Sequence, residues 1–108
     1  MKRAIWISFD LGVRGDYEGM YAWLDKNQAK ECGDSLAYLT FQFDGDLLSS
    51  LTKDIEESLE LVTKKTRVYV IWQDPESNKM KGRFIFGARK APSWAGSSGG
   101  SESESDEG

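Results

Sequence analysis

Hydrophobic and polar residues alternate along several short segments of this chain. In residues 4–9, Ile5, Ile7 and Phe9 occupy one side and Ala4, Trp6 and Ser8 the other. A period of two is typical of a β-strand with one buried face. The same alternation predicts strands over 35–43, 67–72 and 81–86, and a short strand before a tight turn at Gly33-Asp34.

Two other segments repeat their apolar residues with a helical period. The first helix is predicted over 17–27 with Asp16 as its N-cap, and its apolar face consists of Tyr17, Met20, Tyr21 and Leu24. The second is predicted over 47–62, after Asp44-Gly45-Asp46, and its apolar face consists of Leu48, Leu51, Ile55, Leu59 and Val62. The acidic turn Asp44-Gly45-Asp46 is predicted to cap the N-terminus of this helix.

The order of these elements is β-α-β-β-α-β with an extra C-terminal strand. It predicts an α+β ferredoxin-like sandwich, in which two helices cover one face of the sheet. The other face is then apolar, with Trp6, Leu36, Tyr38, Tyr69 and Ile71. Such a face favours a homodimer interface or a cover formed by 88–96 through Trp94. Stacking of these aromatic rings on unpaired nucleic-acid bases is a less favoured alternative.

The last residues differ in composition from the rest. We expect a single domain over 1–96 and a disordered acidic Ser/Gly tail over 97–108. The net charge is −4, from 14 basic and 18 acidic residues. Because four of the acids lie in the tail, the folded part is neutral, which does not indicate a strongly basic nucleic-acid binder. The tail is interpreted as a solvated segment, with a partner-binding or nucleic-acid-competing role as alternatives.

Residue types that are missing or rare exclude several kinds of chemistry. The chain has no histidine and one cysteine, Cys32, so catalytic triads with histidine and an internal disulfide are excluded. No apolar run approaches the length of about 20 residues that a membrane span requires. We therefore expect a cytoplasmic protein that does not interact with membranes.

Asp10 is the main candidate for a functional residue, because it follows the first strand and precedes a glycine-containing loop. It is predicted either to cap the amides of Gly12 or Val13 or to bind Mg²⁺. One carboxylate per chain is too few for a metal site, so the second interpretation requires a symmetric dimer. Asp44-Gly45-Asp46 is a further candidate to ligate the metal together with Asp10, with helix capping as the favoured interpretation of this turn. The loop with Gly12, Arg14 and Gly15 is a candidate anion-binding site before a helix.

Three stretches carry a resemblance to known proteins. They are Ile5-Trp6-Ile7-Ser8-Phe9-Asp10-Leu11, Phe43-Asp44-Gly45-Asp46-Leu47 and Arg67-Val68-Tyr69-Val70-Ile71. Over residues 4–86 the pattern resembles the small CRISPR adaptation subunit and the virulence-associated protein D toxins. The resemblance implies a ferredoxin-like fold and, in some members, a metal-dependent nuclease whose strand-end acid, here Asp10, meets its twin across a dimer axis. Other members are non-catalytic assembly platforms. The glycine-containing loop after Asp10, the short hairpin before Leu36 and the acidic tail depart from that pattern.

Residues and resemblance together predict a small dimeric protein of a bacterial defence or toxin-type system. Its expected role is that of a non-catalytic protein-interaction module, with Trp6, Tyr38, Tyr69 and Ile71 at the interface. One alternative is a magnesium-dependent endoribonuclease or other nuclease of a phage-defence or toxin–antitoxin setting, with Asp10 as catalytic residue and metal ligand. The other is a binder of small nucleotides at Gly12–Asp16. A protein partner and nucleic acid both remain open as ligands.

Overall fold

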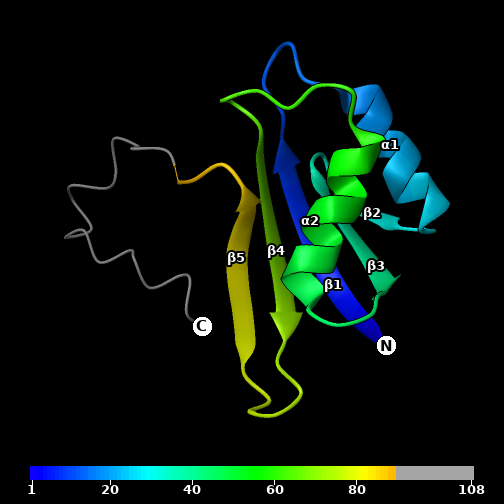
Figure 1. The fold of residues 1–108 in the computed structure, drawn as a ribbon, viewed down its shortest axis with the longest axis vertical. Helices are drawn as coiled ribbons and strands as arrows, with labels where there is room; N and C mark the ends of the chain where they lie inside the picture. The colour runs from blue at the N-terminus through cyan, green and yellow to red at the C-terminus, as the bar shows by residue number, and fades with distance from the viewer. Residues whose placement is uncertain (90–108) are drawn as a thin grey trace.

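The computed structural model describes residues 1–89, which form one antiparallel five-stranded sheet and two helices (Figure 1). The strand order is β2-β3-β1-β4-β5. The predicted α+β class with helices on one face is therefore confirmed. The predicted domain limit at residue 96 and the tail over 97–108 lie outside the described residues. The elements are β1 (Lys2–Asp10), α1 (Tyr17–Lys26), β2 (Lys30–Gly33), β3 (Leu36–Gln42), α2 (Leu47–Ser58), β4 (Arg67–Gln73) and β5 (Met80–Phe86).

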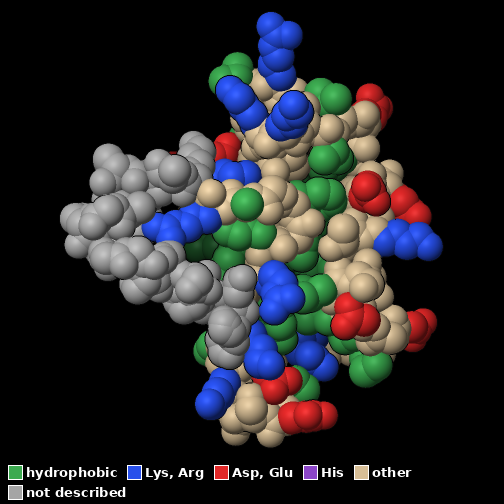
Figure 2. Space-filling view, turned by 60° about the vertical axis from the view of Figure 1, so that its left-hand side comes forward, with side chains coloured by type: hydrophobic (Ala, Val, Ile, Leu, Met, Phe, Trp, Pro, Cys, Tyr) green, Lys and Arg blue, Asp and Glu red, His purple; other side chains and the backbone are tan. Residues whose placement is uncertain are grey.

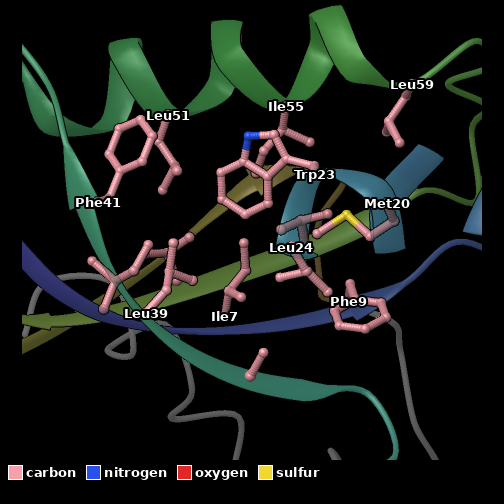
Figure 3. Packing of buried hydrophobic residues seen from close by; sticks show 14 of the residues in the cluster. Ile7, Phe9, Met20, Trp23, Leu24, Leu39, Phe41, Leu51, Ile55 and Leu59 are labelled. Carbon is pink, nitrogen blue, oxygen red and sulfur yellow. The ribbon is translucent and has the colours of Figure 1, made fainter. Parts of the chain in front are cut away.

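The hydrophobic core lies between the sheet and the two helices. β1 is the middle strand and pairs with β3 on one side and β4 on the other, so its apolar side is enclosed along its length. Ile5 and Ile7 are fully buried, and Trp23 of α1 is 1% exposed. Figure 3 shows Trp23 between α2 and Ile7 of β1, and Leu51 and Ile55 of α2 directed toward the strands. The alternation predicted for 4–9 therefore places the expected residues in the core.

The two helices contact each other closely through residues of α1. The indole Nε1 of Trp23 donates a hydrogen bond of 2.7 Å to Oδ2 of Asp54 on α2. A Cβ placed on Gly19 would lie 2.7 Å from the carbonyl oxygen of Ser58, so α1 approaches the end of α2 where it has no side chain. The indole is thus buried with its polar atom satisfied, as a buried donor requires.

The predicted extent of α2 was wrong at its C-terminal end. The helix ends at Ser58 and not at residue 62, and Val62 is 42% exposed. The backbone N–H of Glu60 donates to Oδ2 of Asp16 at 2.7 Å, which replaces the helical hydrogen bond it would otherwise make. At the other end, Leu47 is buried where Leu48 was predicted to be.

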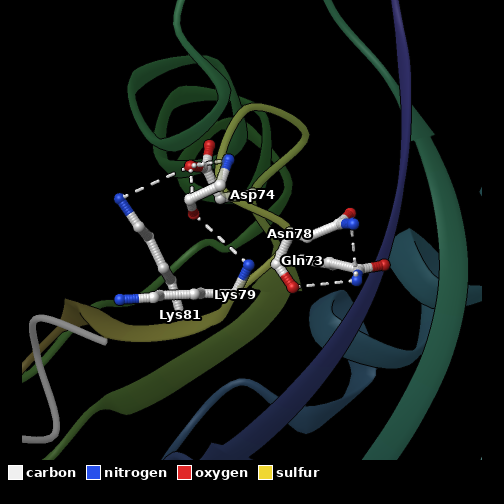
Figure 4. Close-up of polar contacts among 6 residues, drawn as sticks. Gln73, Asp74, Asn78, Lys79 and Lys81 are labelled. Carbon is white, nitrogen blue, oxygen red and sulfur yellow. Dashed lines mark hydrogen bonds and ion pairs between the residues drawn. The ribbon is translucent and has the colours of Figure 1, made fainter.

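The two outer hairpins differ slightly from the prediction. The β2–β3 turn is formed by Asp34 and Ser35, one residue later than predicted, and all four residues of edge strand β2 are exposed. The β4–β5 turn is organised by Asp74, whose Oδ2 accepts hydrogen bonds from Ser77 and lies 3.9 Å from Nζ of Lys81 (Figure 4). The Ser77 hydroxyl is the main cause that holds the pKa of Asp74 below its ordinary value. The predicted turn over 74–78 is confirmed.

Asp16 links α1 to the segment after α2 and gives the first testable prediction. Its carboxylate accepts hydrogen bonds from the backbone N–H groups of Glu60 and Gly19, and these bonds hold its pKa below 3.8. Because the pKa is lower in the folded state, the stabilisation is present above pH 3.8 and is lost as pH falls through the lowered pKa. We expect Asp16→Ala to lower the Tm by several degrees at neutral pH, and the difference from wild type to shrink below pH 3.8.

Asp46→Ala is the matched control for this prediction. Asp46 is the N-cap of α2, but its carboxylate bonds only within the first turn, to Ser49. Replacement of Asp46 should therefore lower the Tm less than replacement of Asp16. Asp16→Ala removes both a helix cap and a hydrogen bond to a residue 44 positions away in the sequence. Thermal unfolding followed by circular dichroism measures both variants. An equal loss of Tm in the two variants would show that the Asp16–Glu60 bond contributes nothing.

Candidate functional site

Asp10 ends β1 and forms an ion pair with the neighbouring strand. It lies directly opposite Arg67, the first residue of β4, and Nη2 of Arg67 is 3.0 Å from Oδ2 of Asp10. Its other oxygen, Oδ1, accepts a hydrogen bond of 3.2 Å from the backbone N–H of Gly12. The predicted capping of Gly12 is therefore present. The side chain of Asp10 is still 48% exposed, so solvent and ligands can reach it.

A cavity of about 800 Å³ opens beside this ion pair. Two loops form most of it: the loop between β1 and α1, and the loop between α2 and β4, with Lys64 and Lys65 in the second. The lining residues are Asp10, Gly12, Val13, Tyr17, Lys64, Lys65, Arg67 and Ala88. Figure 2 shows Lys and Arg side chains gathered at its top, the end where Figure 1 places these two loops. Among the residues that the structure describes, the cavity is thus lined by more positive than negative charge.

Short hydrogen bonds hold the two loops in place. In the second loop, the hydroxyl of Thr66 accepts from the backbone N–H of Thr63 at 2.9 Å, and Thr66 is 2% exposed. In the first, the backbone N–H of Leu11 donates to the hydroxyl of Tyr17 at 3.0 Å. Gly12 has a φ of +80°, which favours glycine at this bend. These hydrogen bonds therefore position the exposed lysines and the loop amides.

Only part of the predicted anion site lines this surface. Gly12 lines the main cavity and also an adjoining one of about 320 Å³, and Arg14 lines the adjoining one. Gly15 does not line either cavity, since it packs against Leu11. Sequence reasoning missed Lys64, Lys65 and Arg67. The basic segment Lys64-Lys65-Thr66-Arg67 could have indicated an anion-binding surface. Nothing in the sequence, however, placed this segment beside Gly12. Anion binding by Gly12, Arg14 and Gly15 stays a prediction.

Asp44 and Asp46 cannot share a metal ion with Asp10 in one chain. The backbone N–H of Phe43 donates to the carbonyl oxygen of Met1 at 2.8 Å, so the acidic turn lies at the opposite end of β1 from Asp10. A strand of this length spans about 27 Å. Asp46 caps α2 by accepting a hydrogen bond of 2.9 Å from the N–H of Ser49. The metal-ligand alternative for this turn is corrected, and the capping interpretation is confirmed.

The residues around Asp10 do not fit a divalent cation within one chain. Two lysines and an arginine line the same cavity, and a cation would be repelled by them. Among residues 1–89 there is no group of three or more acidic, cysteine or histidine side chains that could hold a metal. A magnesium ion at Asp10, with Asp10 as catalytic residue, stays a prediction that requires a carboxylate from a second copy.

The helix-free face of the sheet carries the predicted interface residues side by side. Trp6 pairs with Tyr38 on β3 and with Ile71 on β4, and the rings of Trp6 and Tyr38 are 5.0 Å apart. Tyr69 contacts Phe84 of β5 with ring centroids at 4.8 Å. Sequence reasoning missed Phe84, although the alternation over 81–86 could have indicated it. We call this surface, formed by Trp6, Leu36, Tyr38, Tyr69, Ile71 and Phe84, the open face.

The open face is apolar but not deeply buried. All six of its residues are intermediate in exposure, and both helices lie on the opposite side of the sheet (Figure 1). The predicted cover by Trp94 falls on residues that the structure does not describe. The basic and aromatic strand β5 lies at the sheet edge, away from the central position that a base-stacking motif occupies.

Comparison of the chain with protein-family models, with curated proteins and with solved structures found no match. The resemblance described above therefore stays a prediction. Within residues 1–89, no helix has both the length and the apolar character needed to cross a bilayer.

Proposed function

We propose that the protein is a non-catalytic interaction module of ferredoxin-like architecture that forms a homodimer through the open face. The observation that carries this proposal is the run of aromatic and aliphatic side chains across β3, β1 and β4, with both helices of residues 1–89 on the other side of the sheet. The proposed setting in bacterial defence or a toxin system rests on the sequence resemblance alone.

The ferredoxin-like assignment is supported by the way the elements connect. Two β-α-β units are split so that β1 lies between β3 and β4, and β2 is at the edge. The additional strand β5 pairs antiparallel with β4 and widens the sheet on that side. In this arrangement both helices are on one face, and no helix of residues 1–89 covers the second face.

The chemistry of the open face favours protein contact over exposure to water. Trp and Tyr are enriched among residues that dominate binding energy, because their rings bury 150–250 Å² each at low entropic cost. A two-fold axis through the middle of the face would bring the same residues of two copies together. Trp6 on the central strand, between Tyr38 and Ile71, would then lie near the centre of the interface.

A charge at the centre of the open face tests this proposal. We expect wild type to sediment as a dimer and Trp6→Glu to sediment as a monomer, because a buried unpaired carboxylate costs several kcal/mol. Tyr69→Glu should have the same effect. Thr40→Glu is the matched control: Thr40 is on the same face of β3 but is already exposed, so the dimer should persist.

Sedimentation velocity measures the three variants and wild type, and circular dichroism shows whether each is folded. A wild type that stays monomeric at high concentration would refute the homodimer. Loss of the dimer in Thr40→Glu as well would show that the interface is not centred on Trp6.

The nuclease alternative has less support from the geometry. It requires Asp10 to bind a cation, whereas the Asp10 carboxylate is bonded to Arg67 and Gly12 and shares its cavity with lysines. The third alternative, binding of a small nucleotide near Gly12, is favoured by that same cavity.

A further inference from the structure

We propose that the cavity beside Asp10 binds a phosphate-bearing ligand of nucleotide size, with Lys64, Lys65 and Arg67 as the phosphate contacts and Asp10 as an internal competitor for Arg67. This site is separate from the homodimer proposal, because it is formed by loops at one end of the sheet and not by the centre of the open face.

The charge of the cavity selects an anion. Among residues 1–89, three basic side chains and one carboxylate line it, and Arg14 lines the adjoining cavity beside the same two lysines. Because the chain outside the acidic tail is neutral, this excess is local and not a property of the whole surface. A phosphate would bring the negative charge that offsets the mutual repulsion of these cations.

Arg67 has hydrogen-bonding capacity suited to a phosphate. Its bond to Asp10 is made by Nη2 alone, and its buried Nε has no acceptor among residues 1–89. A guanidinium carries five donors in a fixed fork, which matches the oxygens of a phosphate better than a single carboxylate oxygen. An incoming phosphate can therefore compete with Asp10 for Nη2 of Arg67.

The size and lining of the cavity indicate a small molecule. About 800 Å³ is within the range of 300–1,000 Å³ that holds cofactor-sized ligands. Val13, Tyr17 and Ala88 provide apolar surface for the uncharged part of such a ligand. A nucleic-acid strand would call for a basic stripe along the surface, whereas the described cations that line the cavity come from one loop and the strand that follows it.

Asp10 makes the proposal sharply testable, since its two roles predict opposite results. If Asp10 competes with the ligand, Asp10→Asn should bind the phosphate about threefold to tenfold more tightly, because one nearby negative charge is removed. An asparagine oxygen can still accept the hydrogen bond from Gly12, so the loop should keep its shape. If Asp10 instead holds a metal that binds the phosphate, ADP should bind wild type only when EDTA is replaced by Mg²⁺, and Asp10→Asn should weaken that binding.

The experiment is isothermal titration of the full chain with ADP at low ionic strength in the presence of EDTA. We expect Lys64→Gln combined with Lys65→Gln to weaken ADP binding about tenfold or more. Lys26→Gln is the matched control, because Lys26 is an exposed lysine at the end of α1 that does not line the cavity, and binding should be unchanged. Trp6→Glu should bind ADP as wild type does, which separates this result from the outcome for the dimer.

Besides weaker ADP binding by Asp10→Asn, three kinds of result would overturn the proposal. The first is the absence of ADP binding by wild type, or ADP binding that the double lysine variant does not change. The second is inorganic phosphate binding as tightly as ADP, which would show that the cavity takes an ion and makes no use of its apolar lining. The third is tight binding of a single-stranded oligonucleotide without binding of ADP, which would identify a macromolecular ligand.

Discussion

Replacement of Trp23 by alanine is expected to lower the free energy of unfolding by about 3–5 kcal/mol. Trp23 is the largest of the fully buried side chains and is 1% exposed. It fills the space between α1, α2 and the sheet, where Figure 3 shows it above Ile7. The substitution removes the ring contacts, leaves a cavity and takes away the donor that satisfies Asp54.

Urea unfolding followed by circular dichroism measures this loss. Trp23→Phe keeps part of the volume and should lose less, so it provides a measurable variant if the alanine variant does not fold. Tyr21→Ala is the matched control on the same helix: Tyr21 is 50% exposed, and its truncation should cost about 1 kcal/mol or less. A Trp23→Ala variant as stable as Tyr21→Ala would show that the helix-to-sheet core is packed differently.

Replacement of Gly15 by alanine is expected to cost about 2–3 kcal/mol. An added Cβ would lie 2.2 Å from Cβ of Leu11 and 2.3 Å from its carbonyl oxygen, and Leu11 is 1% exposed. Neither the buried side chain nor the backbone can move aside cheaply. The loop is also held by hydrogen bonds from the Gly15 N–H to Gly12 and from the Tyr17 N–H to Gly15.

Gly33→Ala is the control for the glycine prediction. A Cβ there would meet only Cβ of Leu36 at 3.9 Å, an ordinary contact, so its stability should match wild type. Both variants are compared by urea unfolding. A Gly15→Ala variant as stable as Gly33→Ala would mean that the loop between β1 and α1 has another conformation, and would remove the basis for placing Gly12 and Val13 in the cavity.

The sequence predicted the secondary structure well where local pattern is strong. Alternation over 4–9 and over 35–43 placed Ile5, Ile7 and Leu39 in the core, since a strand residue has only two directions available. The end of α2 could not be predicted in this way. The apolar period continues past Ser58, but the helix stops where the N–H of Glu60 is bonded by Asp16, 44 residues earlier.

The candidate site shows the same division. Asp10 could be singled out from its place after a strand, and its bond to the Gly12 amide follows from local turn chemistry. Its ion pair could not be predicted, because Arg67 is 57 residues away and reaches Asp10 only through the antiparallel register of β1 and β4. The antiparallel register of β1 and β3 separates Asp44 and Asp46 from Asp10.

By itself, the sequence determined the α+β class, the two faces of the sheet and the apolar character of the open face, since these follow from short-range periodicity. Only the tertiary structure decided which charges meet. The cavity with Asp10, Lys64, Lys65 and Arg67 exists because strand pairing brings two distant loops to one end of the sheet. Electrostatic interactions act through space, and the order of residues along the chain does not specify distances between segments that pair only on folding.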